Sequence, residues 1–328
     1  MVKIAVVILN YNGRHFLEKF LSKVIERSPG ASVIVSDNKS TDDSVSFLRK
    51  EFPTVRLIEL DKNHGFAGGY NETLRLVDSE YYVLLNSDVE VSENWLEPMI
   101  DFLDANNDYA ACQPKIKDYQ NKNKFEYAGA CGGFIDILGY PYCRGRIFDQ
   151  TEIDIGQYDE PADIFWSSGA CMMIRAKDFH HAGAFDSSFF AHMEEIDLCW
   201  RLNSLGRKIR VVPKSTVFHV GGGTLSYQSP FKTYLNFRNG LKLLIKNLPL
   251  KQYIIKIPLR VILDWVAAVI FLLQGNGRHA ISVLKSHLYF FSRLSKEHKK
   301  RRLTSQLNSP KSVVWNYFIK NRKTFQDQ

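Results

Sequence analysis

Apolar and polar positions in the first third of the chain follow two alternating patterns. Residues 4–9 form an unbroken apolar run, which is typical of a strand buried on both faces of a sheet. The apolar residues between 16 and 24 recur at helical spacing. The same reasoning predicts strands over 32–36, 55–60 and 81–85, and helices over 44–52, 70–77 and 95–103. Strands and helices that alternate at this spacing predict a mostly parallel sheet with helices on both faces.

Farther along the chain the pattern becomes less regular. Residues 112–165 mix glycine, tyrosine and charged residues, which predicts irregular hairpins. A strand, a helix and a second strand are expected over 171–175, 196–205 and 209–212. Beyond residue 230 the apolar residues return to helical spacing while basic residues accumulate. We therefore expect an α/β domain over 1–240 and a basic, amphipathic helical extension over 241–328.

The most apolar stretch of this extension, 257–273, fits two interpretations. It has 17 residues and contains Pro258, Arg260 and Asp264, whereas a helix that crosses a bilayer needs roughly 20 apolar residues. A helix that lies in a membrane interface with its apolar side down is one interpretation. A core-facing helix of a C-terminal bundle fits the pattern equally well.

Charge is distributed unevenly along the chain. The net charge is +8, yet residues 231–328 carry 19 Lys and Arg against three acidic residues, so they carry +16 and the remainder −8. Such a basic segment attracts nucleic acid or an anionic membrane surface. Because no helix-turn-helix, zinc-finger or RNA-binding aromatic pattern is found, we expect a membrane surface and no nucleic acid. Arg238 and the basic run 298–302 are expected near the headgroups.

Composition narrows the class of protein further. The 328 residues are 45% hydrophobic and 24% charged, which excludes wholesale disorder, collagen-like repeats and a coiled coil. The five cysteines are dispersed and never form a C-x-x-C pair, so neither a disulfide framework nor a structural zinc site is expected. A reducing compartment fits these thiols, and the short apolar run 4–9 is expected to be a strand rather than a signal peptide.

Polar residues stand directly after two of the predicted strands. Asp37 follows the strand 32–36, and Asn86, Ser87 and Asp88 follow the strand 81–85. Ligands of open α/β sheets bind beyond the carboxyl ends of the strands. A divalent ion that bridges nucleotide phosphates needs only one or two carboxylates, so Asp88 is a candidate ligand. We expect Ser40, Thr41 and Asp42 to cap the helix that follows, and Asp37 to contact the ligand.

A second group of candidates lies near the end of the α/β pattern. Glu194, Glu195 and Asp197 open a predicted helix directly after an aromatic stretch, and the helix dipole alone favours some of this charge. A carboxylate among aromatic rings has a raised pKa, which suits a general base. His219 ends a strand before the glycine run 221–223, which lets the backbone approach a phosphate.

The segment 63–71 is rich in glycine and opens a helix, as many phosphate-binding loops do. It matches neither the G-x-G-x-x-G fingerprint nor a P-loop that ends in Gly-Lys-Ser or Gly-Lys-Thr. A dinucleotide-binding oxidoreductase is therefore disfavoured.

Taken together and in order, these segments resemble the family-2 inverting glycosyltransferases with the GT-A type fold of nucleotide-diphospho-sugar transferases. The resemblance covers about residues 1–240 and is nearest to the rhamnosyltransferase-like branch of bacterial surface polysaccharide synthesis. The stretches that carry it are VVILNYNG, VSDNKSTDDS, NHGFAGGYN, VLLNSDVEV, SSGACMMIR, GAFDSSFFAHMEEIDLCWR and FHVGGGT.

The resemblance implies roles for individual positions. Asp37 would contact the nucleobase, and Asp88 and His219 would hold Mg²⁺ or Mn²⁺. Glu195 would be the catalytic base, with Glu194 as the alternative. The remaining residues expected around the nucleotide sugar are Asn10, Asn12, Asn38, Gly65, Gly68, Asn71, Asn86, Ser87, Gly169 and Asp197.

The expected reaction is metal-dependent transfer of a sugar from a nucleotide-diphospho-sugar, with dTDP-rhamnose first and UDP- and GDP-sugars open. The acceptor would be a glycan or a polyprenyl-diphosphate-linked glycan. The enzyme is expected to be cytoplasmic and peripheral on the inner face of the cell membrane. A sugar nucleotidyltransferase is one alternative, although residues 10–13 (Asn-Tyr-Asn-Gly) stand where it needs a basic, glycine-rich loop. A non-catalytic nucleotide-sugar-binding protein or scaffold is the other.

Overall fold

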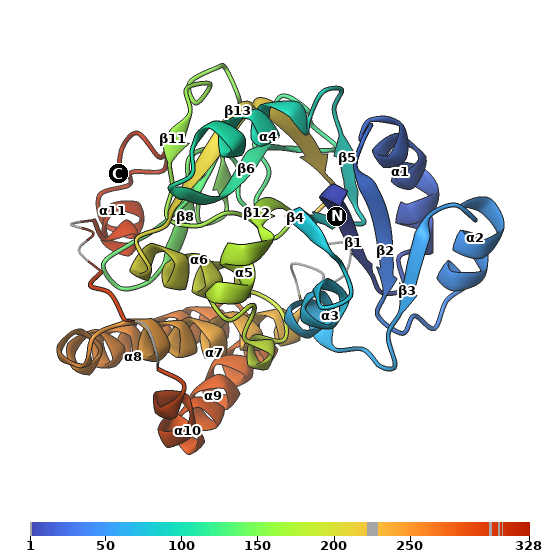
Figure 1. Ribbon diagram of the computed structural model, residues 1–328. Helices are drawn as coiled ribbons and strands as arrows, with labels where there is room; N and C mark the ends of the chain where they lie inside the picture. The colour runs from blue at the N-terminus through green and yellow to red at the C-terminus, as the bar shows by residue number, and fades with distance from the viewer. Residues whose placement is uncertain (1, 222–228, 302–303, 308, 310) are drawn as a thin grey trace.

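The computed structural model describes residues 2–221, 229–301, 304–307, 309 and 311–328. Its first quarter alternates strands and helices as the sequence predicts (Figure 1). These elements are β1 (Val2–Asn10), α1 (Arg14–Glu26), β2 (Ser32–Asp37), α2 (Ser44–Glu51), β3 (Arg56–Glu59), α3 (Gly65–Leu74) and β4 (Ser79–Asn86).

The next part of the chain completes the main sheet and adds a small second sheet. The elements are β5 (Val89–Val91), α4 (Glu97–Ala105), β6 (Tyr109–Asp118), β7 (Gly133–Ile135), β8 (Pro141–Cys143), β9 (Arg146–Ile147), β10 (Gln150–Thr151), β11 (Ala162–Asp163), β12 (Cys171–Arg175), α5 (Ala176–His181), the 3-10 turn η1 (Ser187–Phe189), α6 (Glu194–Ser204) and β13 (Lys208–His219). The small sheet has the order β10-β9-β8-β7 and occupies the region for which irregular hairpins are predicted.

The main sheet has the order β11-β13-β6-β12-β4-β1-β2-β3, with β5 beside β13. β1 runs parallel to β2 and β4, whereas β12 is antiparallel to β4 and β6. The register pairs Asn10 with Asp37 and Leu9 with Asn86, so three polar strand ends meet at one edge. The predicted mostly parallel GT-A type sheet is confirmed.

Two apolar cores cover the two faces of this sheet. One core contains Leu17 of α1, Leu48 of α2 and Met99 of α4. The other contains Tyr70 of α3 and Trp200 of α6, together with the buried face of the helix that follows β13. Burial of apolar side chains on both faces fixes the sheet between two helical layers, as expected for alternating strands and helices.

The C-terminal helices belong to the same structure as the sheet. They are α7 (Pro230–Asn247), α8 (Leu250–Leu273), α9 (Gly277–Ser292), α10 (Leu294–Lys299) and α11 (Val313–Phe318). α7 packs on α6 and α9, and its Leu241 and Leu244 are part of the core around α6. The predicted boundary between residues 240 and 241 therefore falls inside α7.

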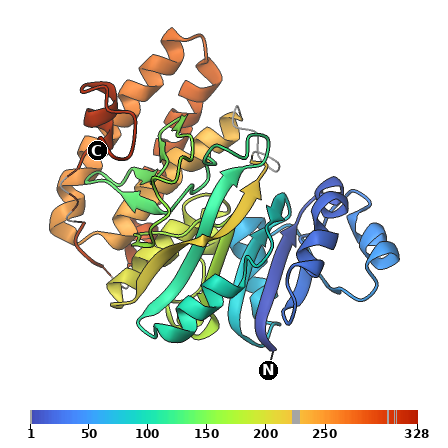
Figure 2. The same ribbon diagram turned by 90° about the horizontal axis from the view of Figure 1, so that it is seen from above.

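α8 and α9 pack against each other at the end of the molecule away from α1 and α2 (Figure 1; Figure 2). Ile257 of α8 is buried in the main core, but many other apolar side chains of this pair are exposed. None of the helices in the described part of the chain combines the length and the apolar character needed to cross a membrane.

Candidate active site

The ends of β1 and β2 hold a buried carboxylate in a fixed position. Asn10 Nδ2 donates a hydrogen bond to Asp37 Oδ1 at 3.0 Å. The backbone N–H of Ser40 donates to Asp37 Oδ2 at 2.9 Å, and its hydroxyl donates to Oδ1 at 2.6 Å. Asp37 thus has its orientation set before any ligand binds, at the sheet edge where ligands of α/β proteins are found.

The two asparagines beside this carboxylate tie neighbouring loops together. Asn12 Oδ1 accepts a hydrogen bond from the backbone N–H of Thr41 at 2.7 Å. Asn38 Nδ2 donates to the carbonyl oxygen of Gly65 at 3.0 Å. Asn38 therefore connects the end of β2 to the glycine-rich start of α3.

The start of α3 lies against the segment that precedes α6. Gly65 has a left-handed φ of +69°, and a Cβ there would lie 2.5 Å from the ring of Phe190. The backbone N–H of Phe66 donates to the carbonyl of Phe190 at 2.8 Å. Asn71 Nδ2 donates to the carbonyl of Phe185 at 2.8 Å. These contacts give the glycine and Asn71 structural roles.

Two further glycines of the prediction also lie at close contacts. A Cβ on Gly68 would lie 2.9 Å from the Cβ of His64, and one on Gly169 would lie 3.0 Å from the ring of Phe66. The residue after Gly169, Ala170, accepts a hydrogen bond from the backbone N–H of Asn86 at 3.0 Å. Residues 64–68, 169–170 and 86 are thus neighbours.

The end of β4 and the end of β13 bring an acid and a histidine together. His219 Nε2 lies 3.1 Å from Asp88 Oδ1, and Asn86 Nδ2 lies 3.4 Å from the same nitrogen. Ser87 lies between Asn86 and Asp88, and its Oγ is 3.3 Å from where Gly13 would carry a Cβ. The predicted metal residues, distant in sequence, are therefore direct neighbours.

Glu126 is a third member of this cluster that sequence reasoning missed. Its Oε2 lies 3.2 Å from His219 Nδ1, and the side chain is 2% exposed. Burial lowers the pKa of His219, but the negative charges of Asp88 and Glu126 outweigh it and hold that pKa well above its usual range. Glu126 lies in the loop between β6 and β7 and belongs to no recognisable motif. Nothing in the sequence therefore pointed to it.

The segment before α6 has an unusual backbone. Phe190, His192 and Met193 have left-handed φ values of 67°, 68° and 74°. Left-handed conformations of residues other than glycine are uncommon and often mark functional sites. Glu194 and Glu195 follow directly as the first residues of α6.

Both glutamates have raised pKa values. Burial raises the pKa of Glu195 to about 7, and burial together with the charge of Glu195 raises the pKa of Glu194 well above its usual range. Among the described residues, one carboxylate oxygen of each glutamate and Nε2 of His192 have no hydrogen-bond partner. Glu194 is buried, whereas Glu195 is partly exposed, which makes Glu195 the more accessible base.

Asp197 contacts protein groups on every side. Its carboxylate pairs with Arg201 at 2.9 Å and with Lys246 at 2.8 Å, and Asn247 donates to it at 2.9 Å. These partners tie α6 to α7. A contact of Asp197 with the nucleotide stays a prediction, and its partners favour a structural role.

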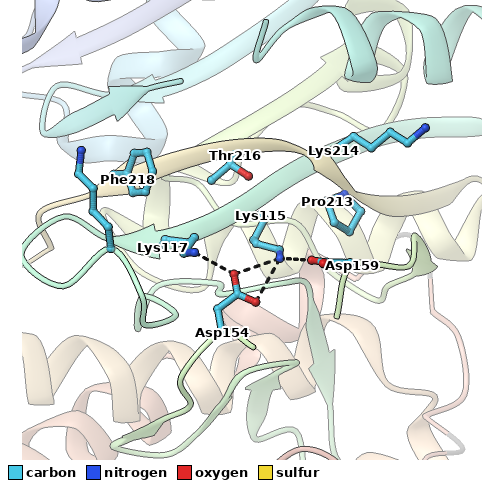
Figure 3. A pocket seen from close by; sticks show the side chains of 9 residues that line it. Lys115, Lys117, Asp154, Asp159, Pro213, Lys214, Thr216 and Phe218 are labelled. Atoms are coloured by element: carbon cyan, nitrogen blue, oxygen red, sulfur yellow. Dashed lines mark hydrogen bonds and ion pairs between the residues drawn. The ribbon is translucent and has the colours of Figure 1, made fainter. Parts of the chain in front are cut away.

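A separate hollow of about 510 Å³ lies along β6 and β13 (Figure 3). Lys115 and Lys117 at its floor pair with Asp154, so their charge is balanced inside the protein. Phe218 also lines the hollow, and successive strand residues point to opposite faces. The side chain of His219 therefore points away from it, and the hollow is not part of the candidate site.

The site and the fold together define a class of protein. A fixed carboxylate, an acid–histidine pair and a carboxylate with a raised pKa lie around the carboxyl edge of a mostly parallel sheet. This arrangement is the one expected of a sugar-transferring enzyme of the GT-A type. Residues 5–181, more than half of the chain, match the family model described as Glycosyl transferase family 2, and the chain belongs to that family.

Curated relatives agree with this assignment and with the resemblance to rhamnosyltransferases. The N-acetylglucosaminyl-diphospho-decaprenol L-rhamnosyltransferase of Mycobacterium tuberculosis (strain ATCC 25618 / H37Rv) is 25% identical over 236 residues, covering 65% of this chain and 75% of the relative. Rhamnosyltransferase WbbL of Escherichia coli (strain K12) is 22% identical over 219 residues, covering 65% and 82%. The protein is a glycosyltransferase.

Solved structures share the fold at low sequence identity. The structure of GalNAc-T7 with UDP, GalNAc and Mn²⁺ has a TM-score of 0.59 and 15% identity, covering 76% of this chain. This chain spans about half of the GalNAc-T7 chain, 49%. The mannosyltransferase PcManGT from Pyrobaculum calidifontis, in complex with GDP-Man and Mn²⁺, has a TM-score of 0.54 and 13% identity, covering 87% and 86%.

Proposed function

We propose that the protein transfers a sugar from a nucleotide-diphospho-sugar to an acceptor hydroxyl with inversion, and that Glu195 is the base. One observation carries the proposal: the carboxylate of Glu195, whose pKa burial raises to about 7 and whose Oε2 is buried without a hydrogen-bond partner among the described residues, follows the segment whose Phe190 carbonyl accepts from Phe66 of α3. Glu195 takes the hydroxyl proton and the oxygen bonds to the anomeric carbon. The bond from that carbon to the diphosphate breaks, and the nucleoside diphosphate leaves with the electron pair.

Asp88 and His219 fit a divalent metal ion. Their Oδ1 and Nε2 atoms are 3.1 Å apart, and carboxylate oxygen and neutral imidazole nitrogen are ligands that Mn²⁺ accepts. Binding would therefore release the proton that the raised pKa of His219 retains in the absence of metal. The described residues contain no cluster of three or more His, Cys, Asp or Glu placed to hold a metal. A two-residue site leaves the other positions to water and diphosphate oxygens. When bound, such an ion offsets the charge that develops on the leaving diphosphate.

The relatives suggest the donor and the acceptor. Two of them are named as rhamnosyltransferases, so dTDP-rhamnose is the first donor to test, with UDP- and GDP-sugars next. The name of the M. tuberculosis relative includes a diphospho-decaprenol-linked N-acetylglucosamine. A lipid-linked glycan is accordingly our acceptor class, met at the cytoplasmic face of the membrane.

A panel of nucleotide sugars with and without Mn²⁺ tests the donor. A ligand that binds the folded state raises Tm, by an amount that grows with the logarithm of its concentration over Kd. We expect one nucleotide to raise Tm with Mn²⁺ present, and the matching nucleotide sugar to release nucleoside diphosphate when acceptor is added. A chain that binds no nucleotide sugar, or binds one and never turns it over, would refute the proposal.

Membrane association is proposed from the surface of α8 and α9. Their exposed apolar side chains are Leu250, Ile254, Ile255, Leu259, Ile262, Trp265, Val266, Val269, Ile270, Leu272, Leu273, Ile281, Leu284, Leu288 and Phe291. Between residues 250 and 300 the two acidic residues, Asp264 and Glu297, are buried. The exposed charges here are therefore basic, including Lys251 and Lys285, and an apolar surface edged by cations suits anionic lipid.

Point variants test this surface, because Ile257 and Leu307 belong to the main core and a truncation would expose them. Ile262→Glu combined with Leu288→Glu places charge at two positions that are 59% and 63% exposed. We expect wild type to float with phosphatidylglycerol vesicles, less so in high salt, and the variant to float about tenfold less. Ile155→Glu, at an 82% exposed loop position, is the control. Equal flotation of all three proteins would contradict membrane association through this surface.

A further inference from the structure

α7 presents buried polar side chains to the segment that precedes the glutamates. Asn239 and Lys242 are 0% exposed and Arg238 is 7% exposed, although such residues are rarely buried in a helix without partners. Arg238 was expected near lipid, and Lys242 lies in the segment expected to be the basic extension. The structure buries Arg238 instead, because backbone carbonyls satisfy it.

The partners of these side chains are carbonyl oxygens of the segment 188–192. Asn239 Nδ2 donates to Phe189 at 3.1 Å, to Ala191 at 2.9 Å and to His192 at 2.8 Å. Arg238 Nη2 donates to the carbonyl of Phe189 at 2.7 Å. The middle of α7 thus holds the backbone on both sides of Phe190.

Two more hydrogen bonds stabilise this contact between α7 and the segment 188–192. Lys242 Nζ donates to the carbonyl of Ser188 at 2.8 Å. Arg238 Nε donates to Asn239 Oδ1 at 2.9 Å, so the amide oxygen faces the guanidinium and the amide nitrogen faces the carbonyls. The orientation of the Asn239 amide is therefore set by the hydrogen bonds on both of its ends.

The backbone of the segment 188–193 needs stabilisation by the rest of the protein. Phe190, His192 and Met193 have left-handed φ values, and such residues persist only where the surrounding structure fixes their backbone. The three residues precede Glu194 directly, so their conformation sets where α6 begins and where the two glutamates point.

We infer that Asn239, supported by Arg238 and Lys242, is the positioning residue for the catalytic carboxylate. It acts through its two amide hydrogens, which are shared among the carbonyls of Phe189, Ala191 and His192. This inference rests on the proposed role of Glu195. Loss of the donors lets the segment relax and moves the carboxylate away from the acceptor hydroxyl, and small misplacements of reacting groups reduce rates strongly.

Asn239→Asp tests the inference, since it keeps the size of the side chain and removes its N–H donors. We expect kcat to fall at least about tenfold, with the donor KM changed less than about twofold. We also expect faster amide hydrogen exchange across 188–196 and unchanged exchange across β1 and α3. Asn239→Ala should reproduce both effects.

Two asparagines of the same helix are controls. The side chain of Asn236 makes no hydrogen bond within the described part of the chain. Asn236→Ala should therefore leave kcat and amide exchange unchanged. Asn247 ties α7 to Asp197 of α6 and has no hydrogen bond to the segment 188–192. Asn247→Ala should therefore lower stability and leave the hydrogen bonds to that segment intact. If the two variants lose the same Tm, kcat should fall further in Asn239→Asp than in Asn247→Ala.

Two outcomes would overturn the inference. One is unchanged exchange across 188–196 in both Asn239 variants. The other is equal kcat for Asn239→Asp and Asn247→Ala at equal Tm. Exchange is measured without substrate, so its result stands apart from the proposed reaction. Suppose that the wild-type protein transfers no sugar, yet the Asn239 variants exchange faster across 188–196. That result refutes the proposed function and restricts the role of Asn239 to fixing the segment.

Discussion

The two sides of the candidate site are built in different ways. On the nucleotide side, Asp37 is held by Ser40, three residues later, and by Asn10 of the adjacent strand. On the base side, the segment before Glu195 is held by Asn239, about fifty residues later. One side is fixed by local hydrogen bonds and sheet register. The other depends on a helix from the end of the chain.

Under the roles proposed for Asp37 and Glu195, this difference should separate binding from turnover. A carboxylate that already has its partners can accept a ligand without rearrangement, whereas a buried carboxylate oxygen without a partner is prepared to accept a proton. Changes on the nucleotide side should therefore act on affinity. Changes on the base side should act on kcat.

The largest effect is expected on the base side. Glu195→Gln should lower kcat by at least about 10²-fold, because general-base catalysis contributes typically about 10²–10⁴-fold. The Kd for the nucleotide sugar, from isothermal calorimetry, should stay within about threefold of wild type. Glu194→Gln is the matched variant. If it loses kcat while Glu195→Gln does not, Glu194 is the base.

A smaller effect of the opposite kind is expected on the nucleotide side. Asp37→Ala removes a carboxylate whose hydrogen bonds to a ligand are worth about 1.5–3 kcal/mol, so the Kd should rise about 10–100-fold. Its kcat at saturating donor should change far less. The surface carboxylate variant Asp43→Ala should bind as wild type does, and similar Kd values for both variants would remove Asp37 from the pocket.

Glu126 tests whether the acid–histidine pair is itself held in place. Carboxylates that orient a metal-binding histidine typically affect metal affinity 10–100-fold, so Glu126→Gln should weaken Mn²⁺ binding about tenfold. Electron paramagnetic resonance of free Mn²⁺, titrated in the presence of nucleoside diphosphate, measures this affinity. Glu152→Gln, at a partly buried glutamate elsewhere in the protein, should leave it unchanged. Unaltered Mn²⁺ affinity in Glu126→Gln would separate Glu126 from the metal.

The smallest effect concerns stability and pH. Burial raises the pKa of Glu195 from 4.5 to about 7, so between these values the folded protein keeps a proton that the unfolded chain releases. Stability contributed by this group is therefore lost as pH rises from 4.5 through 7. Glu195→Gln should raise Tm by a few degrees at pH 8 and less at pH 5. Glu160→Gln, an exposed site, should show no such difference in a calorimetric scan.

The sequence predicted the sheet well because buried strands and amphipathic helices leave strong periodic patterns. The start of α3 at Gly65, rather than at residue 70, was missed because contacts with Phe190 determine it. Asp88 and His219 were expected to share a metal ion only through the family resemblance, and the structure places them 3.1 Å apart. Glu126 carried no pattern, since only tertiary packing brings it to His219.

The basic extension shows the limit of counting charges. Its excess of positive charge was expected to need an anionic partner outside the protein. Lys246 instead pairs with Asp186 and Asp197, and Arg301 donates to the carbonyl of Leu248 at 2.5 Å. Part of the positive charge is therefore used inside the protein, to bind α7 to α6 and its preceding segment.

Diffraction from crystals grown with Mn²⁺ and the nucleoside diphosphate that raises Tm tests the central claim most directly. The account predicts an anomalous peak from Mn²⁺ between Asp88 and His219. It also predicts the nucleobase at Asp37 and the diphosphate end of the nucleotide directed toward Glu195. Mn²⁺ and nucleotide bound together elsewhere, such as in the hollow at Lys115, would contradict it.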